Sequence, residues 1–362
     1  MWGLRPGALV RLPGVTSVYS ERRDYSLVGP ERAVARERGL SDADWYRSPV
    51  DRATMKKLVQ RRDQPAVLHT ALWLVLLVAF GVLGHLTWGS WWAVPVFFVY
   101  GTLYGSLSDA RWHECGHGTA FATPWLNTVV YHLASFMDIR EAISWKWSHT
   151  RHHSDTIVVG LDPEIAYPRP TPFWKIALEC FAILSVWKEW KKIALNVVGR
   201  FTAEELEYLP EAERPKAVRT ARVYVAIYLL VVLVVVYTGS VEPAMYVVLP
   251  TFYGRWLLVL YGTTQHAGLA EDVLDHRLNT RTVYMNRLNR FCYLNMNYHV
   301  EHHMFPNVPY HALPALHDAV RTDMPPAYPS IAAAYREILP ALRRQQREPG
   351  YFVERPLPTG AA

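Results

Sequence analysis

Four long apolar runs constrain the fold of this chain more than any other feature of its sequence. Residues 66–86 and 87–107 are each 21 residues long without Asp, Glu, Lys or Arg, and residues 223–241 and 243–264 contain Arg255 as their single charge. At about 1.5 Å per residue, a helix of this length crosses a hydrocarbon layer about 30 Å thick. Short turns join the runs in pairs, so we expect an all-α membrane protein with four transmembrane helices in two hairpins.

The distribution of basic residues predicts how the hairpins are oriented. The two hairpin tips, residues 84–92 and 238–243, contain no Lys or Arg, so 37 of the 38 basic residues lie in the N-terminal, central and C-terminal segments. Lys and Arg near membrane helices are retained on the cytoplasmic side. We therefore expect both termini to be cytoplasmic, in the cytoplasmic (inner) membrane, and the net charge of +6 needs no nucleic acid to explain it.

Two further apolar segments, residues 121–139 and 173–195, are interrupted by polar or charged residues. We interpret both as helices that lie in the membrane interface.

The three cysteines are far apart and form no C-x-x-C pair. This spacing argues against disulfides and cysteine-held iron–sulfur clusters and fits a reducing compartment.

Eight of the 15 histidines fall into three groups with helical spacing. At offsets of three and four residues, the imidazoles of each group share one helix face. If the second membrane helix continues past residue 107, the first group begins about 9 Å beyond it, on the cytoplasmic side. The groups are H-E-C-G-H with His113 and His117, H-T-R-H-H with His149, His152 and His153, and H-V-E-H-H with His299, His302 and His303.

Eight imidazoles are too many for one metal ion. A catalytic zinc uses three protein ligands, so the three groups predict two metal ions side by side, with positions left for oxygen or substrate. Imidazole suits iron, copper, nickel and zinc alike, so the ligand type does not select the metal. We expect a cytoplasmic helical cap to hold this histidine-rich di-metal site.

The three histidine boxes, their order and their placement around two hairpins resemble the membrane-bound fatty acid desaturase and hydroxylase superfamily. The likeness covers roughly residues 66–306, and Y-H-V-E-H-H-M-F-P is its most specific part. It implies a cytoplasmic segment over 1–65, a transmembrane and catalytic domain over 66–310, and a helical cytoplasmic tail over 311–362. The third box departs from the front-end desaturase form, which has Gln at the position of His299, so that subgroup's double-bond position does not carry over.

The resemblance also implies the chemistry. Members of this superfamily hold two iron ions almost wholly by histidine, take electrons from an external donor, and use O2 to attack an unactivated C–H bond of a lipid chain. They draw one more imidazole from the stretch before the third box. Here T-Q-H-A-G-L supplies His266 as the ninth ligand, with His276 as its competitor.

Several charged residues are candidates for supporting roles. Carboxylates beside ligating histidines orient the rings and raise their basicity. A cation inside a membrane segment is costly and is usually paired or faces a polar cavity, so Arg255 is a candidate for binding an anionic substrate group, with an ion pair or a snorkelling side chain as the alternative. The candidate supporting carboxylates are Glu114, Asp155, Asp162 and Glu301.

The sequence shows no dinucleotide-binding pattern and no cysteine cluster, so reducing equivalents are expected from a partner. The expected donor is a ferredoxin or a rubredoxin with its NAD(P)H-linked reductase. The basic cytoplasmic face would steer an acidic donor of this kind.

Competing interpretations come from two classes. H-E-C-G-H satisfies the zinc-peptidase pattern, and G-L-D-P at 160–163 resembles a ligand motif of intramembrane proteases, but a protease leaves most of the boxed histidines without a role. A metal transporter would place its ligands at the bilayer midplane rather than outside it.

Within the superfamily, desaturation, hydroxylation and alkene-forming decarboxylation need the same boxes, and desaturation is the reaction we expect.

Overall fold

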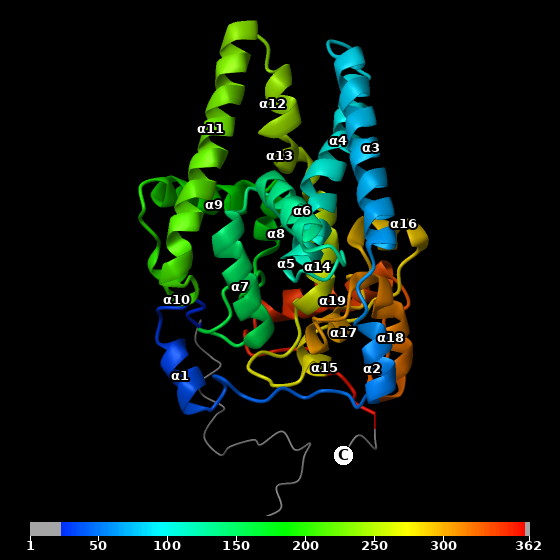
Figure 1. Ribbon diagram of the computed structural model, residues 1–362. Coiled ribbons are helices and arrows are strands. Elements are labelled where there is room, and N and C mark those ends of the chain that lie inside the picture. The colour runs from blue at the N-terminus through cyan, green and yellow to red at the C-terminus, as the bar shows by residue number, and fades with distance from the viewer. Residues whose placement is uncertain (1–22, 359–362) are drawn as a thin grey trace, which may run out of the picture.

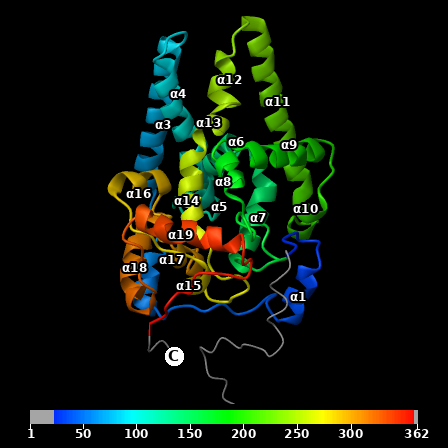
Figure 2. The same cartoon turned by 180° about the vertical axis from the view of Figure 1, so that it is seen from behind.

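The computed structural model describes residues 23–358, which fold into helices joined by loops. The first 22 residues of the expected N-terminal segment and the last four of the expected tail lie outside the described residues. Long helices rise from a layer of shorter helices, and both ends of the described chain lie away from the hairpin tips (Figures 1 and 2). Over residues 23–358, β-type pairing is limited to two isolated bridges. The expected all-helical fold is confirmed.

The first two apolar runs form a hairpin of α3 (Asp63–Thr87) and α4 (Ala93–Gly105). Apolar side chains on its outer surface are exposed, including Val78 at 65% and Leu86 at 72%. Trp91 lies in the turn and is 91% exposed. Exposed apolar surface on this scale suits contact with lipid rather than water.

The second helix of this hairpin ends earlier than a continuous extension to the first histidine box requires. It stops at Gly105, and α5 (Leu107–Gly116) begins after Ser106. The Ser106 hydroxyl donates to the carbonyl of Gly254 and accepts the backbone N–H of Leu258 at 3.0 Å. The break in this helix is therefore tied to a break in the other hairpin.

The second hairpin pairs one long helix, α11 (Arg214–Thr238), with three short ones. The fourth apolar run is divided because proline starts two of the pieces, and a helix interior does not tolerate proline's missing N–H and its ring. The pieces are α12 (Glu242–Val247), α13 (Pro250–Gly254) and α14 (Trp256–His266).

The hairpins meet where glycines let two backbones touch. A Cβ placed on Gly254 would lie 1.8 Å from the carbonyl oxygen of Gly101, and a Cβ on Gly101 would lie 2.1 Å from the Tyr253 ring. α4 and α13 therefore approach as closely as helices can, as small residues allow in membrane helix packing.

Two continuous stretches of the described chain, Arg52–Thr87 and Glu211–Thr238, are long and apolar enough to cross a membrane. They contain α3 and α11. Their partners α4 and α12 to α14 are shorter or interrupted, so four complete membrane crossings stay a prediction.

The remaining helices form the layer from which the hairpins rise, and short 3₁₀ turns cover 211–213, 310–312 and 321–323. On the N-terminal side lie α1 (Glu31–Glu37) and α2 (Arg52–Leu58). Between the hairpins in sequence lie α6 (Pro124–Met137), α7 (Ala142–Ser154), α8 (Phe173–Glu179), α9 (Ile183–Val197) and α10 (Ala203–Tyr208). After the second hairpin follow α15 (His276–Asn279), α16 (Arg287–Tyr293), α17 (His299–Met304), α18 (Leu313–Val320) and α19 (Ile331–Gln345).

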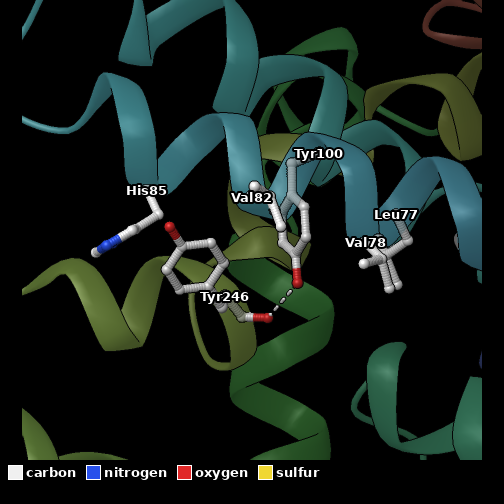
Figure 3. A pocket seen from close by; sticks show the side chains of 7 residues that line it. Leu77, Val78, Val82, His85, Tyr100 and Tyr246 are labelled. Carbon is white, nitrogen blue, oxygen red and sulfur yellow. Dashed lines mark hydrogen bonds between the residues drawn. The ribbon is translucent and has the colours of Figure 1, made fainter.

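A groove of about 470 Å³ runs between the two hairpins near their tips (Figure 3). Two of its lining residues share a partner: the Tyr246 hydroxyl donates to Glu242 at 3.0 Å, and His85 Nδ1 lies 2.7 Å from the same carboxylate. The contact between His85 and Glu242 joins the tip of α3 to α12. The lining is otherwise largely apolar: Leu77, Val78, Gly81, Val82, His85, Tyr100 and Tyr246.

Candidate metal centre

The three histidine boxes lie on short helices that converge beneath the hairpins. The first box ends α5, the second occupies α7, the third occupies α17, and His266 is the last residue of α14. Glu141 fixes the start of α7, because its carboxylate accepts the backbone N–H groups of Ile143 and Ser144. The second box therefore begins in a defined helical register.

Five imidazoles form a first group in which one ring nitrogen per residue lies within 4.8 Å of every other. The Nε2 atom of His149 lies 3.2 Å from both His117 Nε2 and His153 Nε2. His302 Nε2 lies 3.3 Å from His153 Nε2. The group comprises His113, His117, His149, His153 and His302.

A second group meets the same criterion and comprises His152, His266 and His303. His299 completes it, because its Nε2 lies 3.2 Å from His266 Nε2 and 3.1 Å from His303 Nε2. The structure thus brings together all nine histidines expected from the sequence.

The two groups lie side by side because consecutive residues serve different groups. His152 and His153 are neighbours on α7, and His302 and His303 are neighbours on α17, yet each pair is divided between the groups. The rings of His153 and His303 stack with centroids 4.3 Å apart. The spacing of three and four residues in the second and third boxes therefore places imidazoles in both adjacent groups, whereas His113 and His117 of the first box lie in one group.

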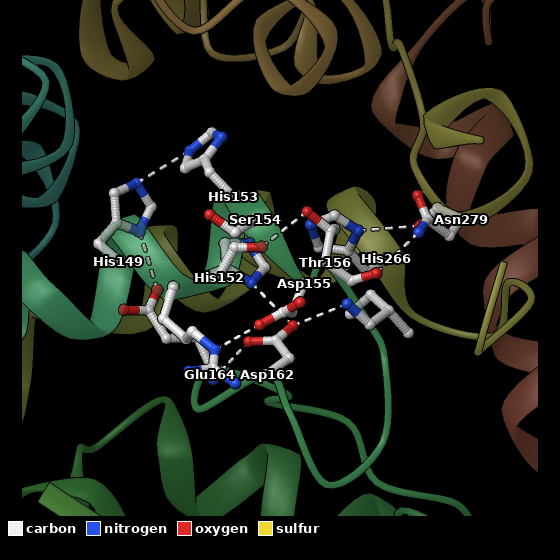
Figure 4. Close-up of polar contacts among 12 residues, drawn as sticks. His149, His152, His153, Ser154, Asp155, Thr156, Asp162, Glu164, His266 and Asn279 are labelled. Carbon is white, nitrogen blue, oxygen red and sulfur yellow. Dashed lines mark hydrogen bonds and ion pairs between the residues drawn. The ribbon is translucent and has the colours of Figure 1, made fainter. Parts of the chain in front are cut away.

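Hydrogen bonds leave lone pairs facing inward on several of these rings. The Nδ1 atoms of His149 and His152 lie 2.9 Å from the carboxylates of Glu164 and Asp162, and His266 Nδ1 lies 2.8 Å from the carbonyl of Asn279 (Figure 4). A carbonyl or a carboxylate only accepts, so each Nδ1 carries the proton. In a neutral imidazole the opposite nitrogen, Nε2, then presents a lone pair.

The residues fit metal ions on these observations. Two imidazole nitrogens bound to one ion at about 2.1 Å and roughly at right angles are about 3 Å apart, close to the Nε2 separations of 3.1–3.3 Å. Both ring nitrogens of His113 are buried without a hydrogen-bond partner. Unpartnered polar atoms of this kind are costly unless a ligand satisfies them.

Burial and crowding favour the neutral form of most of these rings, and His152 is the exception, because Asp162 outweighs burial and raises its pKa. Desolvation, followed by the neighbouring histidines, holds the pKa values of His113, His117 and His153 well below the usual range. Burial opposes ionisation of Glu164, but His149 outweighs it and holds the pKa of this carboxyl at about 2. Neutral imidazoles with ionised carboxylates behind them form a donor set suited to cations.

The expected supporting carboxylates divide into two kinds. Asp162 accepts from His152, as expected. Glu114 is fully buried, with Oε1 3.9 Å from His302 Nδ1, and its other oxygen accepts the Tyr310 backbone N–H at 3.2 Å. Asp155 pairs instead with Arg151, and Glu301 accepts from Thr282 and lies beside His317 Nδ1. The printed partners of these two carboxylates are therefore residues other than the nine histidines.

Glu164 was missed from the sequence. It lies two residues after Asp162, in the loop that follows the second box. The sequence feature that could have pointed to Glu164 is the G-L-D-P turn directly before it, which resembles a protease motif. In the structure this turn brings Asp162 and Glu164 beneath α7 (Figure 4), so the turn supports the histidines.

Replacing Asp162 with Asn should weaken metal binding by about 10- to 100-fold, the usual cost of losing such a supporting contact. The amide keeps the shape but removes the negative charge behind His152. Metal content after titration with a chelator measures the effect. Asp155→Asn is the matched control, because Asp155 faces Arg151, and equal metal retention by both variants would contradict the assigned role of Asp162.

The structure also locates His276, the competitor of His266, and Arg255, the candidate for binding an anionic substrate group. His276 lies outside both groups and stacks on Trp45, with ring centroids 4.3 Å apart, so His266 is the histidine that joins the second group.

Arg255 lies at the junction of α13 and α14, and the charged groups that act on it include Arg140, Asp138 and Glu179. Its Nε is buried without a partner.

Comparisons with known proteins agree with this centre. The model of the fatty acid desaturase family matches residues 89–335, which include all nine histidines of the two groups. An omega-6 fatty acid desaturase of the endoplasmic reticulum from Glycine max is 26% identical over 287 residues, covering 67% of this chain and 71% of the relative. A chloroplastic omega-3 fatty acid desaturase from Brassica napus is 24% identical over 274 residues, covering 68% and 64%.

A shorter match is to a desaturase whose name includes ferredoxin. The sn-1 acyl-lipid omega-3 desaturase (ferredoxin) of Synechocystis sp. is 35% identical over 80 residues, 22% of each chain. The family match alone spans more than half of the sequence. With nine histidines gathered in two adjacent groups, the chain belongs to the fatty acid desaturase family.

Proposed function

We propose that this protein is a membrane-bound, O2-dependent di-iron desaturase that introduces a double bond into a fatty acyl or similar lipid chain. The observation that carries the proposal is the convergence of nine imidazoles into two adjacent groups. When bound there, two iron ions would supply the redox chemistry that activates O2 toward an unactivated C–H bond. The balanced reaction converts a saturated C–C unit, O2, two electrons and two protons into an alkene and two waters.

The chain's own residues hold and orient the reacting centre. The imidazoles would hold the two cations, while Glu164 and Asp162 fix the tautomers of His149 and His152, and the Asn279 carbonyl does the same for His266. Rate and outcome then depend on where the substrate carbon lies relative to the centre.

The structure argues against a zinc peptidase. Glu114, which would be the water-activating residue of H-E-x-x-H, has no exposed surface and accepts from the Thr119 hydroxyl and the Tyr310 backbone. The two histidines of that motif share their group with three further imidazoles. The site thus lacks the open arrangement of three ligands and a water that a catalytic zinc uses.

The proposed membrane arrangement keeps four crossings, with both termini and the metal centre on the cytoplasmic side of the inner membrane. The absence of basic residues at the hairpin tips supports it. α6 and α9 would lie in the interface, where their exposed Trp125 and Trp187 suit the headgroup region. The division into residues 1–65, 66–310 and 311–362 belongs to the same proposal.

The proposed electron donor is a ferredoxin or a rubredoxin with its NAD(P)H-linked reductase. Relatives from Synechocystis sp. and Arabidopsis thaliana are named as ferredoxin-dependent. The positive charge of the chain favours an acidic partner.

The reaction is tested by co-expression with a ferredoxin system and mass spectrometry of lipids and free acids. We expect products lighter by two hydrogens. Products heavier by one oxygen would assign a hydroxylase, and alkenes shorter by one carbon would assign a decarboxylase. Conversion that needs no donor would contradict the proposed electron supply.

Arg255 remains our candidate for an anionic group of the substrate. Hydrogen bonds to charged groups contribute about 1.5–3 kcal/mol, so Arg255→Leu should raise KM by about 10- to 150-fold. Arg255→Lys keeps the charge and should retain much of the affinity. Steady-state kinetics on the folded variants measure this, and an unchanged KM in Arg255→Leu would assign the residue to an ion-pair network with Asp138 instead.

A further inference from the structure

Trp45 and His276 form an aromatic connection between the surface and the metal centre. The rings of Trp45 and His276 are nearly parallel, with centroids 4.3 Å apart and planes inclined by 8°. His276 is 3% exposed, and its ring centroid lies 5.2 Å from that of His303. His303 belongs to the second imidazole group. Three rings in contact thus lead inward from Trp45, which is only partly buried.

The position of Trp45 is fixed on both sides. Its indole Nε1 donates to the Ser154 carbonyl at 2.9 Å, at the end of the α7 helix that carries the second box. The next residue, Tyr46, donates its backbone N–H to the Leu274 carbonyl at 2.9 Å, two residues before His276.

The segment around Trp45 is held at further points. The Tyr46 hydroxyl donates to Asp323 at 2.8 Å, and Arg277 lies over the Tyr46 ring at 3.6 Å. The backbone N–H of Ser48 lies 3.1 Å from the sulfur of Met304, the last residue of the third-box helix. These anchors give the segment little freedom, so the stack is a permanent part of the fold and not a surface side chain in one of many rotamers.

We propose that Trp45 and His276 form the route by which electrons from a protein donor reach the metal centre. The inference rests on the proposed function and adds the point of electron entry to it. A reduced ferredoxin-type iron–sulfur protein docked over Trp45 is oxidised by one electron, and the metal centre is reduced by one. Neither ring is changed overall, and two such transfers supply the two electrons of one turnover.

The segment between α1 and α2, to which Trp45 belongs, crosses the face of the molecule that lies away from the hairpins, beneath α15 (Figure 1). A water-soluble donor reaches this face without meeting the membrane. The contacting rings provide a continuous path through protein that is otherwise packed around the histidines, where His303 and its neighbours are buried.

The test compares electron transfer in iron-loaded variants before any O2 is added. Anaerobic stopped-flow mixing with a reduced plant-type ferredoxin follows donor oxidation by absorbance. Trp45→Leu and His276→Leu should lose most of the fast phase, whereas Trp45→Phe and His276→Phe, which keep an aromatic ring, should recover it in part. Trp187→Leu is the matched control, because Trp187 is 72% exposed on α9 and stacks on no histidine.

Two further measurements separate electron entry from a structural role. Iron content and thermal midpoint should match the wild type in every variant, and dithionite with a small viologen mediator should reduce Trp45→Leu as fast as the wild type. Unchanged ferredoxin oxidation by Trp45→Leu and His276→Leu would overturn the route. Loss of iron from His276→Leu would overturn it too, by making His276 a ligand. Failure of the wild type to bind iron or to oxidise ferredoxin would instead refute the proposed function.

Discussion

Replacing His302 with Ala should remove one metal ion and abolish measurable product formation. His302 belongs to the five-imidazole group, where its Nε2 lies 3.3 Å from that of His153. Loss of a contact behind a ligand costs about 10- to 100-fold in affinity or activity, so loss of the ligand itself should exceed that range. Elemental analysis and product assays on the purified variant measure both effects.

His132→Ala is the control for this prediction. His132 lies on α6 outside both groups, so its replacement should leave the metal content and turnover close to the wild type. Circular dichroism should show that both variants stay helical. Full metal content with normal turnover in His302→Ala would contradict the assignment of that ring to the centre.

Replacing Gly254 with Ala should prevent the two hairpins from packing. The new Cβ would meet the Gly101 carbonyl oxygen at 1.8 Å, and both partners are helix backbone with no side chain to move aside. Overpacking of a core typically costs about 1–3 kcal/mol, and a backbone clash exceeds that range. Because α14 follows α13 directly, the variant should also displace His266.

Gly262→Ala is the matched control within the same hairpin. A Cβ at Gly262 meets nothing within 4 Å, and alanine in a helix is favoured over glycine by up to about 1 kcal/mol. Thermal unfolding in detergent should therefore show a large loss for Gly254→Ala and a small gain or no change for Gly262→Ala. Equal thermal midpoints for the two variants would show that α4 and α13 are not in backbone contact.

The grouping of the histidines was largely predictable from the sequence because the spacing that produces it is local. Spacing of three and four residues on a helix puts rings on one face, and it does so before any tertiary contact forms. The division of the second and third boxes between two groups could not be predicted from local spacing. It depends on how α7 and α17 face each other, which brings His153 against His303.

The carboxylates that contact the boxed histidines were harder to predict than the grouping of the histidines. Asp155 and Glu301 are closer to a box in sequence than Asp162 is, yet they pair with Arg151 and His317. Glu164 is further from its box, but the loop after α7 returns it to His149. The orientation of a carboxylate depends on the competing partners around it, and these come from distant parts of the chain.

For the membrane helices too, some features were predictable from the local sequence and others depend on distant contacts. Runs without charge predicted where the hairpins lie, but length alone did not predict that the fourth run is three helices. Pro250 and Gly254 marked those breaks in the sequence. Their effect depends on Gly101 and Ser106 of the other hairpin, which the run of apolar residues does not reveal.

The most direct test of the di-metal centre is iron K-edge X-ray absorption on the purified protein, with iron quantified on the same sample. The expected result is two irons per chain, a first shell dominated by imidazole nitrogen, and scattering from a second iron nearby. A single metal per chain, or two irons without mutual scattering and imidazole ligation, would contradict the existence of the shared centre.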